Sequence, residues 1–214
     1  YIALHGDAIL KAGYSFESCS REHFNTLASD ISFVDLILGK QRQTKLGSGK
    51  IYPLCFKTFT PEVQQLLTAY AQQGTSIFVS GAYVASDLWD NKLAKPQEAD
   101  LAFAKNILKY QWRNSKAAIT GRLSTVRSPL NLTRTEYTYA HTLNPNTYIV
   151  EAPDAIEPAC DSAYTVMRYP ENNLSAAVAY RGAYKTFVMG IPFESIMDSI
   201  KREKLMAEII RFFE

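Results

Sequence analysis

A tyrosine lies where a strand-to-helix turn usually carries a catalytic nucleophile. Residues 76–81 (Ser-Ile-Phe-Val-Ser-Gly) predict a buried strand, and a helix is predicted shortly after Tyr83. Small residues two positions before and after the central residue, here Gly81 and Ala85, are typical of a nucleophile elbow. A tyrosine, with an ordinary pKa of about 10, attacks a carbonyl poorly near neutral pH. Tyr83 is therefore expected to form a wall of a crevice, or to act as an acid.

Two carboxylates follow predicted strands and could perform acid–base chemistry. Asp87 lies in the first turn of the helix after Tyr83, and Glu194 follows a predicted strand at 186–191. Carboxyl pairs about 5–9.5 Å apart hydrolyse glycosides. Each residue also has a structural interpretation: Asp87 as a partner of the helix N-terminus, and Glu194 as a turn contact. The sequence leaves both open.

Parallel strands are expected to position these groups. Thr60 and Pro61 begin a helix whose apolar positions recur at helical spacing, and the strand 76–81 follows it. Residues 33–39 predict another strand, buried on both faces. Ligands bind beyond the carboxyl ends of parallel strands. The predicted crevice comprises Lys40, Gln41, Ser80, Gly81, Ala82, Tyr83, Pro192 and Glu194.

One acidic residue lies inside an apolar strand. Asp35 interrupts the run 33–39, and a buried carboxylate is costly unless it is paired. We therefore expect Asp35 near a sheet edge, or beside a partner such as a lysine or a backbone N–H.

The remaining elements predict an α/β protein in one domain, residues 1–214. We expect a flavodoxin-like three-layer sandwich with a mainly parallel central sheet and antiparallel additions in the C-terminal half. The turn 181–184 predicts a hairpin, and residues 202–213 a final amphipathic helix. Further predicted strands cover residues 1–4, 14–19, 137–143, 147–152, 164–169 and 176–180, and a further helix covers 97–110.

Composition excludes several classes of protein. The 214 residues are 47% hydrophobic and 21% charged, with a net charge of +2, which is ordinary for a globular domain. No apolar run is long enough to predict a membrane span. Neither a nucleic-acid motif, nor a GxGxxG or Walker A fingerprint, nor a metal-ligand spacing of cysteine and histidine occurs. We expect no cofactor and no metal. Charge is nevertheless segregated, with basic stretches at 40–57 and 105–134 and an acidic loop at 151–161.

The order of elements resembles the class I glutamine-amidotransferase-like fold. The family carries a cysteine at the elbow and a late histidine–glutamate motif. The run Ile191-Pro-Phe-Glu-Ser195 is similar to that late motif. The resemblance places Glu194 at the triad carboxylate, Pro192 at the base histidine and Tyr83 at the cysteine. It therefore implies that glutamine hydrolysis is lost.

A second resemblance covers nearly the whole chain. Three runs are similar to a domain of large secreted bacterial proteins labelled xanthan lyase or golvesin-like: Phe33-Val-Asp-Leu-Ile-Leu-Gly-Lys-Gln41, Phe78-Val-Ser-Gly-Ala-Tyr-Val-Ala-Ser-Asp-Leu-Trp89 and Gly190-Ile-Pro-Phe-Glu194. The chain begins with Tyr1, so we expect a domain cut from a larger exported protein. The resemblance implies a periplasmic or extracellular location, other domains of the parent as partners, and a polysaccharide as a candidate ligand.

The expected function is accordingly a non-catalytic one, in binding, assembly or support. One alternative is a carboxylate-based hydrolase or lyase that acts on a glycan or amide through Asp87 and Glu194. Another is a saccharide-binding module, because exposed aromatic residues near Tyr83 could stack on sugar rings.

Overall fold

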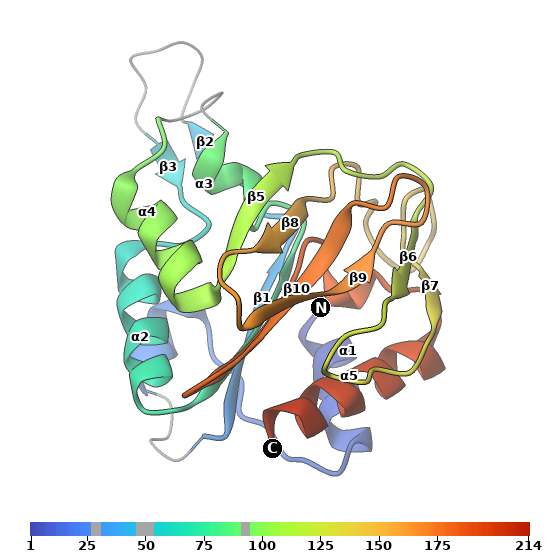
Figure 1. Cartoon of the computed structure of the whole chain (residues 1–214), viewed down its shortest axis with the longest axis horizontal. Coiled ribbons are helices and arrows are strands. Elements are labelled where there is room, and N and C mark those ends of the chain that lie inside the picture. The colour runs from blue at the N-terminus through green and yellow to red at the C-terminus, as the bar shows by residue number, and fades with distance from the viewer. Residues whose placement is uncertain (27–30, 46–53, 91–94) are drawn as a thin grey trace.

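A seven-stranded sheet runs through the molecule (Figure 1). The computed structural model describes residues 1–26, 31–45, 54–90 and 95–214. In order across the sheet, the strands are β1 (Phe33–Gly39), β4 (Ser76–Gly81), β11 (Lys185–Met189), β10 (Ser175–Arg181), β9 (Ala163–Arg168), β6 (Arg122–Thr125) and β7 (Glu136–Thr138). β1, β4 and β11 are parallel, and every later pair is antiparallel.

The predicted flavodoxin-like sandwich with a mainly parallel sheet is therefore wrong. The sheet is curled and mostly antiparallel, and its antiparallel strands continue the same sheet as the parallel ones. The physical reason lies in the connections. A parallel crossover needs a dozen or more residues, whereas residues 169–174 join β9 to β10 and residues 182–184 join β10 to β11. Such short connections permit only antiparallel neighbours, and the hairpin predicted at 181–184 is confirmed.

Helices pack on two faces of the sheet around separate apolar clusters. α1 (Ile2–Lys11) lies against α5 (Ser199–Phe213), and their apolar residues join the core beneath β9 and β10. On the other face, α2 (Pro61–Gln72), α3 (Ser86–Trp89) and α4 (Glu98–Phe103) cover the second cluster. Side chains cap two of these helices: Thr60 accepts from Val63 N–H, and Asp198 from Lys201 N–H.

Several predicted elements differ in the structure. Residues 2–11 form α1, where a strand was expected at 1–4, and residues 14–19 and 147–152 form no strand. The helix expected at 97–110 divides into α4, a π-helical turn η2 (Ala104–Leu108) and the start of β5 (Tyr110–Asn114). The helical run ends before β5 because Lys109 adopts a left-handed conformation, φ +67°.

The smaller elements complete the fold. They are the helical turns η1 (Arg21–Thr26) and η3 (Phe193–Ser195), the two-stranded sheet of β2 (Thr44–Lys45) with β3 (Leu54–Phe56), and the pair formed by β5 and β8 (Ala155–Pro158). Among the helices of the described residues, none is long and apolar enough to cross a membrane.

Candidate functional site

The carboxyl ends of the three parallel strands bring several predicted residues to one edge of the sheet. Lys40 and Gln41 follow β1, Tyr83 follows β4, and Glu194 follows β11. A methyl group placed on Gly39 would lie 3.4 Å from the Glu194 carboxylate, so the ends of β1 and β11 are close neighbours. The backbone N–H of Ala82 donates to Gly39 at 2.9 Å, which holds the β4 turn against β1.

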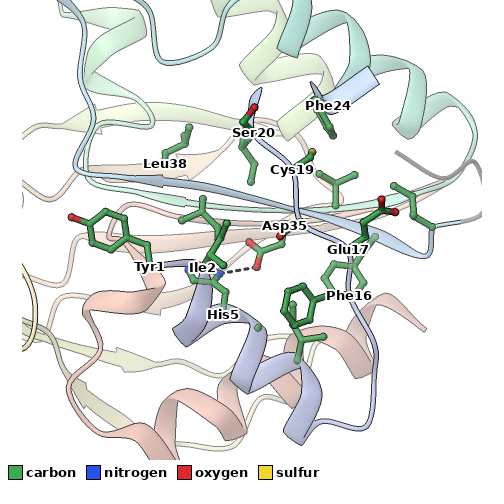
Figure 2. Close-up of a pocket in the computed structure, with 18 of the residues that line it drawn as sticks. Tyr1, Ile2, His5, Phe16, Glu17, Cys19, Ser20, Phe24, Asp35 and Leu38 are labelled. Atoms are coloured by element: carbon green, nitrogen blue, oxygen red, sulfur yellow. Dashed lines mark hydrogen bonds and ion pairs between the residues drawn. The ribbon is translucent and has the colours of Figure 1, made fainter. Parts of the chain in front are cut away.

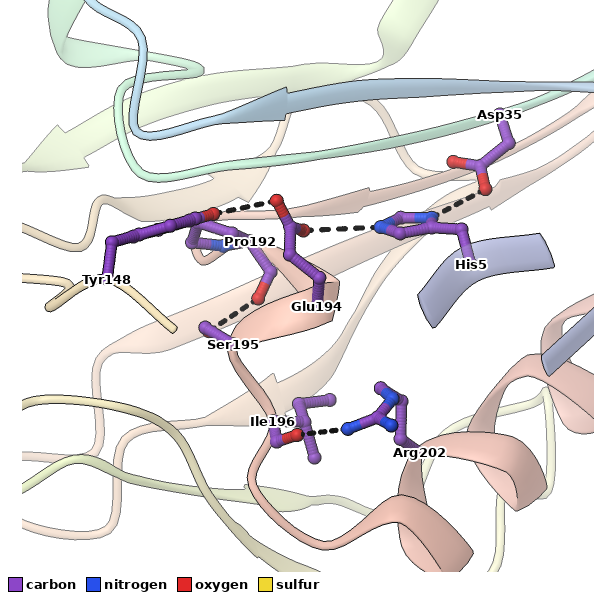
Figure 3. A network of polar contacts seen from close by, with 8 residues as sticks. All are labelled: His5, Asp35, Tyr148, Pro192, Glu194, Ser195, Ile196 and Arg202. Carbon is purple, nitrogen blue, oxygen red and sulfur yellow. Dashed lines mark hydrogen bonds and ion pairs between the residues drawn. The ribbon is translucent and has the colours of Figure 1, made fainter. Parts of the chain in front are cut away.

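The centre of this edge is a buried polar network that includes a histidine the sequence did not single out (Figure 3). His5, on α1, lies with Nδ1 2.7 Å from Asp35 Oδ2 and Nε2 3.2 Å from Glu194 Oε2. The Tyr148 hydroxyl donates to the other Glu194 oxygen at 2.7 Å. The side chains of His5, Asp35 and Glu194 are 2%, 10% and 0% exposed. The network therefore joins four parts of the chain: α1, the edge strand β1, the loop that carries Tyr148, and the turn η3.

The charges of this network are set by its internal contacts. Burial alone would lower the pKa of His5, but Asp35 and Glu194 together raise it to about 9. Burial opposes ionisation of Glu194, yet the bonds from His5 and Tyr148 bring the pKa of that carboxyl below its usual value. At neutral pH the network therefore holds an imidazolium between two carboxylates. Both ring nitrogens of His5 donate, so the ring has no lone pair with which to accept a proton.

Asp35 was expected to lie near an edge of the sheet or beside a polar partner, and the structure shows both. β1 is the terminal strand of the sheet, and the partner is His5 rather than a lysine or a backbone N–H. The second Asp35 oxygen is buried and has no hydrogen-bond partner among the described residues.

Asp87 belongs to a different group of contacts. One of its oxygens accepts short hydrogen bonds from the Gln43 backbone N–H and from the Thr58 hydroxyl. Burial raises the pKa of Asp87 to about 6, and these two bonds oppose that shift. Asp87 thus holds the segment after β1 and the segment before α2, whereas Glu194 binds His5 and Tyr148.

A fully buried carboxyl, Asp154, caps the helix that follows Tyr83. Its Oδ2 accepts from the backbone N–H groups of Ala85 and Ser86, each at 2.8 Å, and from the Ser86 hydroxyl at 3.1 Å. Burial raises the pKa of Asp154 to about 8, against the effect of these bonds. No motif in the sequence predicts a role for Asp154. The available signal was its position in a proline-rich acidic loop, immediately before the apolar Ala155 and Ile156.

Cations lie over the aromatic rings at this edge. Arg42 lies 5.7 Å from the ring centre of Tyr83, and Lys40 lies 5.8 Å from that of Tyr148. Burial raises the pKa of the half-buried Tyr83, an effect that Arg42 opposes. Lys40 also lies 3.4 Å from Glu151, so the first basic stretch meets the acidic loop here. Residues 46–53 of that stretch lie outside the described residues.

The other predicted crevice residues are mostly covered. Ser80, Gly81, Ala82 and Pro192 are buried, and the Ser80 hydroxyl has no hydrogen-bond partner within the described ranges. A cavity of about 1010 Å³ lies beside β1, and of the predicted crevice it touches only Gln41. Within the described part of the chain, no group of three or more histidine, cysteine or acidic side chains could hold a metal ion.

Comparisons with known proteins leave the family open. No protein-family model and no curated protein matches the chain. Among solved structures, the exo-beta-1,4-mannosidase Op5Man5 from Opitutaceae bacterium strain TAV5 is similar over 71% of this chain and 23% of its own, at 14% identity and a TM-score of 0.42. The mmIFT52 N-terminal domain is similar over 72% of both chains, at 14% identity and a TM-score of 0.41. The chain spans under a quarter of the mannosidase. Likenesses this low carry no argument about function.

Proposed function

We propose that this chain is a non-catalytic domain with a binding, assembly or supporting role in a larger secreted bacterial protein. One observation carries the proposal: at the carboxyl ends of the parallel strands, the acidic groups are engaged in contacts that hold the fold. Glu194 has both oxygens bonded, to His5 and to Tyr148. Asp87 and Asp154 bind backbone N–H groups of neighbouring segments.

Glutamine hydrolysis would need a nucleophile beside a base, and this arrangement offers neither. Tyr83 has a raised pKa, which disfavours the phenolate that would attack. Pro192 occupies the position where the resembling family has its base histidine. His5 cannot substitute for that base, because both of its nitrogens point at carboxylates.

A carboxylate-based hydrolase or lyase has less support. It would need Asp87 and Glu194 to face one substrate with free oxygens. Instead each is buried in its own hydrogen-bond group, with different partners. A substrate would have to displace His5 or Tyr148 before Glu194 could react, since both of its oxygens are bonded.

The exposed groups at this edge suit binding to an acidic polysaccharide. Lys40, Gln41 and Arg42 are exposed, and the half-buried rings of Tyr83 and Tyr148 lie beside the two cations. Cations bind sugar carboxylates, and aromatic faces stack on sugar rings. The resemblance to secreted domains labelled xanthan lyase agrees with such a ligand.

An activity assay tests the non-catalytic part of the proposal. The purified chain is incubated with glutamine and with a panel of β-glycosides, and ammonia or reducing sugar is measured. We expect no turnover above buffer. Ammonia release that Tyr83→Phe abolishes would overturn the proposal, as would glycoside hydrolysis that Asp87→Asn abolishes.

A binding assay tests the ligand class. Isothermal titration with an acidic polysaccharide is compared with a neutral one of the same length. The double variant K40A/R42A should lose at least about tenfold in affinity, since it removes both cations. Lys105→Ala, an exposed lysine on η2, is the matched control and should bind normally. Equal binding of acidic and neutral polymers would contradict the role of the cations.

A further inference from the structure

Hydrogen bonds tether the segment that carries Arg42 on both sides of that residue. The Gln41 backbone N–H donates to the carbonyl of Leu38 at 3.1 Å, which closes the turn after β1. The Gln43 backbone N–H donates to Asp87 Oδ2 on α3. Leu38 and Gln41 also line the cavity beside β1, so open space adjoins the segment there (Figure 2). The two hydrogen bonds therefore hold the backbone where packing on that side does not.

Asp87 is itself held in place from two directions. The Thr58 hydroxyl donates to the same carboxylate oxygen that Gln43 binds. Asp154 caps the start of α3, the helix that carries Asp87. Asp87 and Thr58 are only 9% and 1% exposed, so water has little access to the bonds between them. The buried carboxylate thus gives the exposed segment a fixed point of attachment.

The bond between Gln43 and Asp87 also brings together two residues of the proposed binding edge. Arg42 immediately precedes Gln43, and Tyr83 lies in the turn that leads into α3. The Arg42 guanidinium lies 5.7 Å from the centre of the Tyr83 ring. An arginine near a ring can still donate N–H groups to a carboxylate. The cation and the ring are therefore placed to contact the same sugar.

We infer that Asp87 is a positioning residue that holds Arg42 beside Tyr83 for binding of an acidic polysaccharide, an inference that rests on the function proposed above. Asp87 is buried and acts through Gln43 rather than by touching the ligand. An untethered segment would lose conformational freedom on binding, and that loss weakens affinity. The tether removes this cost before the ligand arrives.

A purely electrostatic effect of Asp87 would have the opposite sign. Its negative charge repels an anionic ligand, so removing the charge alone would tighten binding. Removing the tether would weaken binding, because Arg42 would occupy the binding position for only part of the time. The direction of the change in affinity therefore separates the two roles.

The tether should weaken in acid. Burial raises the pKa of Asp87 to about 6, and the bonds from Thr58 and Gln43 oppose that shift, so both bonds favour the carboxylate over the protonated acid. Arg42 lowers the same pKa and Asp90 raises it, through their charges. As the pH falls from about 7 to about 5, Asp87 gains its proton and the affinity for the ligand should fall with it.

Other groups near Asp87 keep their protons over that range. Burial raises the pKa of Asp154 to about 8. Burial also raises the pKa values of Tyr83 and Tyr110, which both feel the charge of Asp87. These three groups stay protonated between about pH 5 and pH 7, so a change in affinity there does not come from them.

Isothermal titration with an oligogalacturonate, whose carboxylates stay ionised at these pH values, tests the inference. At about pH 7, Asp87→Asn should bind at least about fivefold more weakly than the parent. Its affinity should be the same at about pH 5, whereas that of the parent should fall. Asp161→Asn, an exposed change in the turn before β9, removes the same charge and should bind as the parent does. Unchanged or tighter binding by Asp87→Asn would overturn the inference.

Thr58→Val provides a variant that keeps the charge of Asp87. It removes one of the two bonds that favour the carboxylate, so the pH at which the affinity falls should move upward. A profile identical to that of the parent would also overturn the inference. This comparison decides the matter if Asp87→Asn does not fold.

Amide exchange followed by NMR separates this inference from the proposed function. At about pH 7, the Gln43 amide should exchange at least about tenfold faster in Asp87→Asn than in the parent, while amides of β9 exchange equally. If the parent binds no oligogalacturonate, the proposed ligand class fails, and the exchange at Gln43 still tests the tether. Equal exchange at Gln43 in both chains would overturn the tether whether or not the ligand binds.

Discussion

His5 Nε2 and Glu194 Oε2 lie 3.2 Å apart, although 189 residues separate them in the sequence. The histidine comes from the first helix and the glutamate from the turn after the last strand. Through Asp35 the same ring also holds the edge strand of the sheet. One imidazolium thus joins three segments of the chain, and its charge is part of the stability of the fold.

The chain should lose stability as the pH rises from about 6.5 to about 9. The folded pKa of His5, about 9, exceeds its ordinary value, so its contribution is complete below pH 6.5 and is lost as the proton leaves. His5→Gln should cost about 3 kcal/mol at pH 6, because two buried carboxylates lose their cation. Urea unfolding between pH 6 and 9 measures both effects.

The matched control for that experiment is His141→Gln, which changes an exposed histidine. It should retain the slope of the parent chain between pH 6.5 and 9. A His5→Gln variant with the parent's slope would show that other groups cause the pH dependence.

Asp154→Asn should change the response to pH over a lower window. The folded pKa of Asp154, about 8, is raised, so the folded chain prefers the protonated carboxyl and its advantage falls as pH rises from about 4 to 8. The stability of the parent relative to the variant should therefore fall between about pH 4 and pH 8. Asp161→Asn, an exposed change on the other side of β8, should show no such fall in denaturant titrations.

Two glycine-to-alanine changes should differ in cost. A methyl group at Gly190 would collide with the carbonyl oxygen of Asp154, which is backbone and cannot move freely. At Gly6 it would meet the end of the Phe16 ring, a side chain that is 43% exposed. We expect Gly190→Ala to lose about 3 kcal/mol and Gly6→Ala to stay within about 1 kcal/mol, helped by helix propensity. Equal unfolding midpoints would contradict this contrast.

Tyr148→Phe should weaken the network at its outer end. The change removes the hydroxyl that donates to Glu194 at 2.7 Å and leaves a buried carboxylate oxygen without a partner. The expected loss is about 2 kcal/mol. Tyr184→Phe removes a bond to the neutral carbonyl of Ile107 instead, and should cost about half as much. Thermal unfolding of both variants compares these costs.

Local patterns predicted the elements that depend on local chemistry. The Thr60–Pro61 start of α2, the strands ending at Gly39 and Gly81, and the hairpin before β11 are confirmed, because caps, glycines and short turns act within a few residues. The strand order was not predictable in the same way. The order depends on which strands of the whole chain pair with one another. The strand–helix–strand unit that ends at Gly81 favoured a parallel sheet, and that pairing was extended to too many strands.

Only part of the site could be predicted, because some of its residues come from segments that are far apart in the sequence. Glu194 and Tyr83 follow strands, so their approach to the carboxyl edge could be inferred from the order of elements. His5 could not, since it follows the predicted strand 1–4 with no role assigned to it, and its partners are 30 and 189 residues away. The one usable signal was Asp35, a charge in an apolar strand that required a partner.

The place of β11 between β4 and β10 has a consequence for biosynthesis. β4 is buried along its whole length, yet one of its edges is completed only by residues 185–189. While the ribosome makes the intervening residues, about a hundred of them, this edge of β4 still lacks its partner strand β11. The nascent chain can therefore close its central sheet only after β11 has left the exit tunnel.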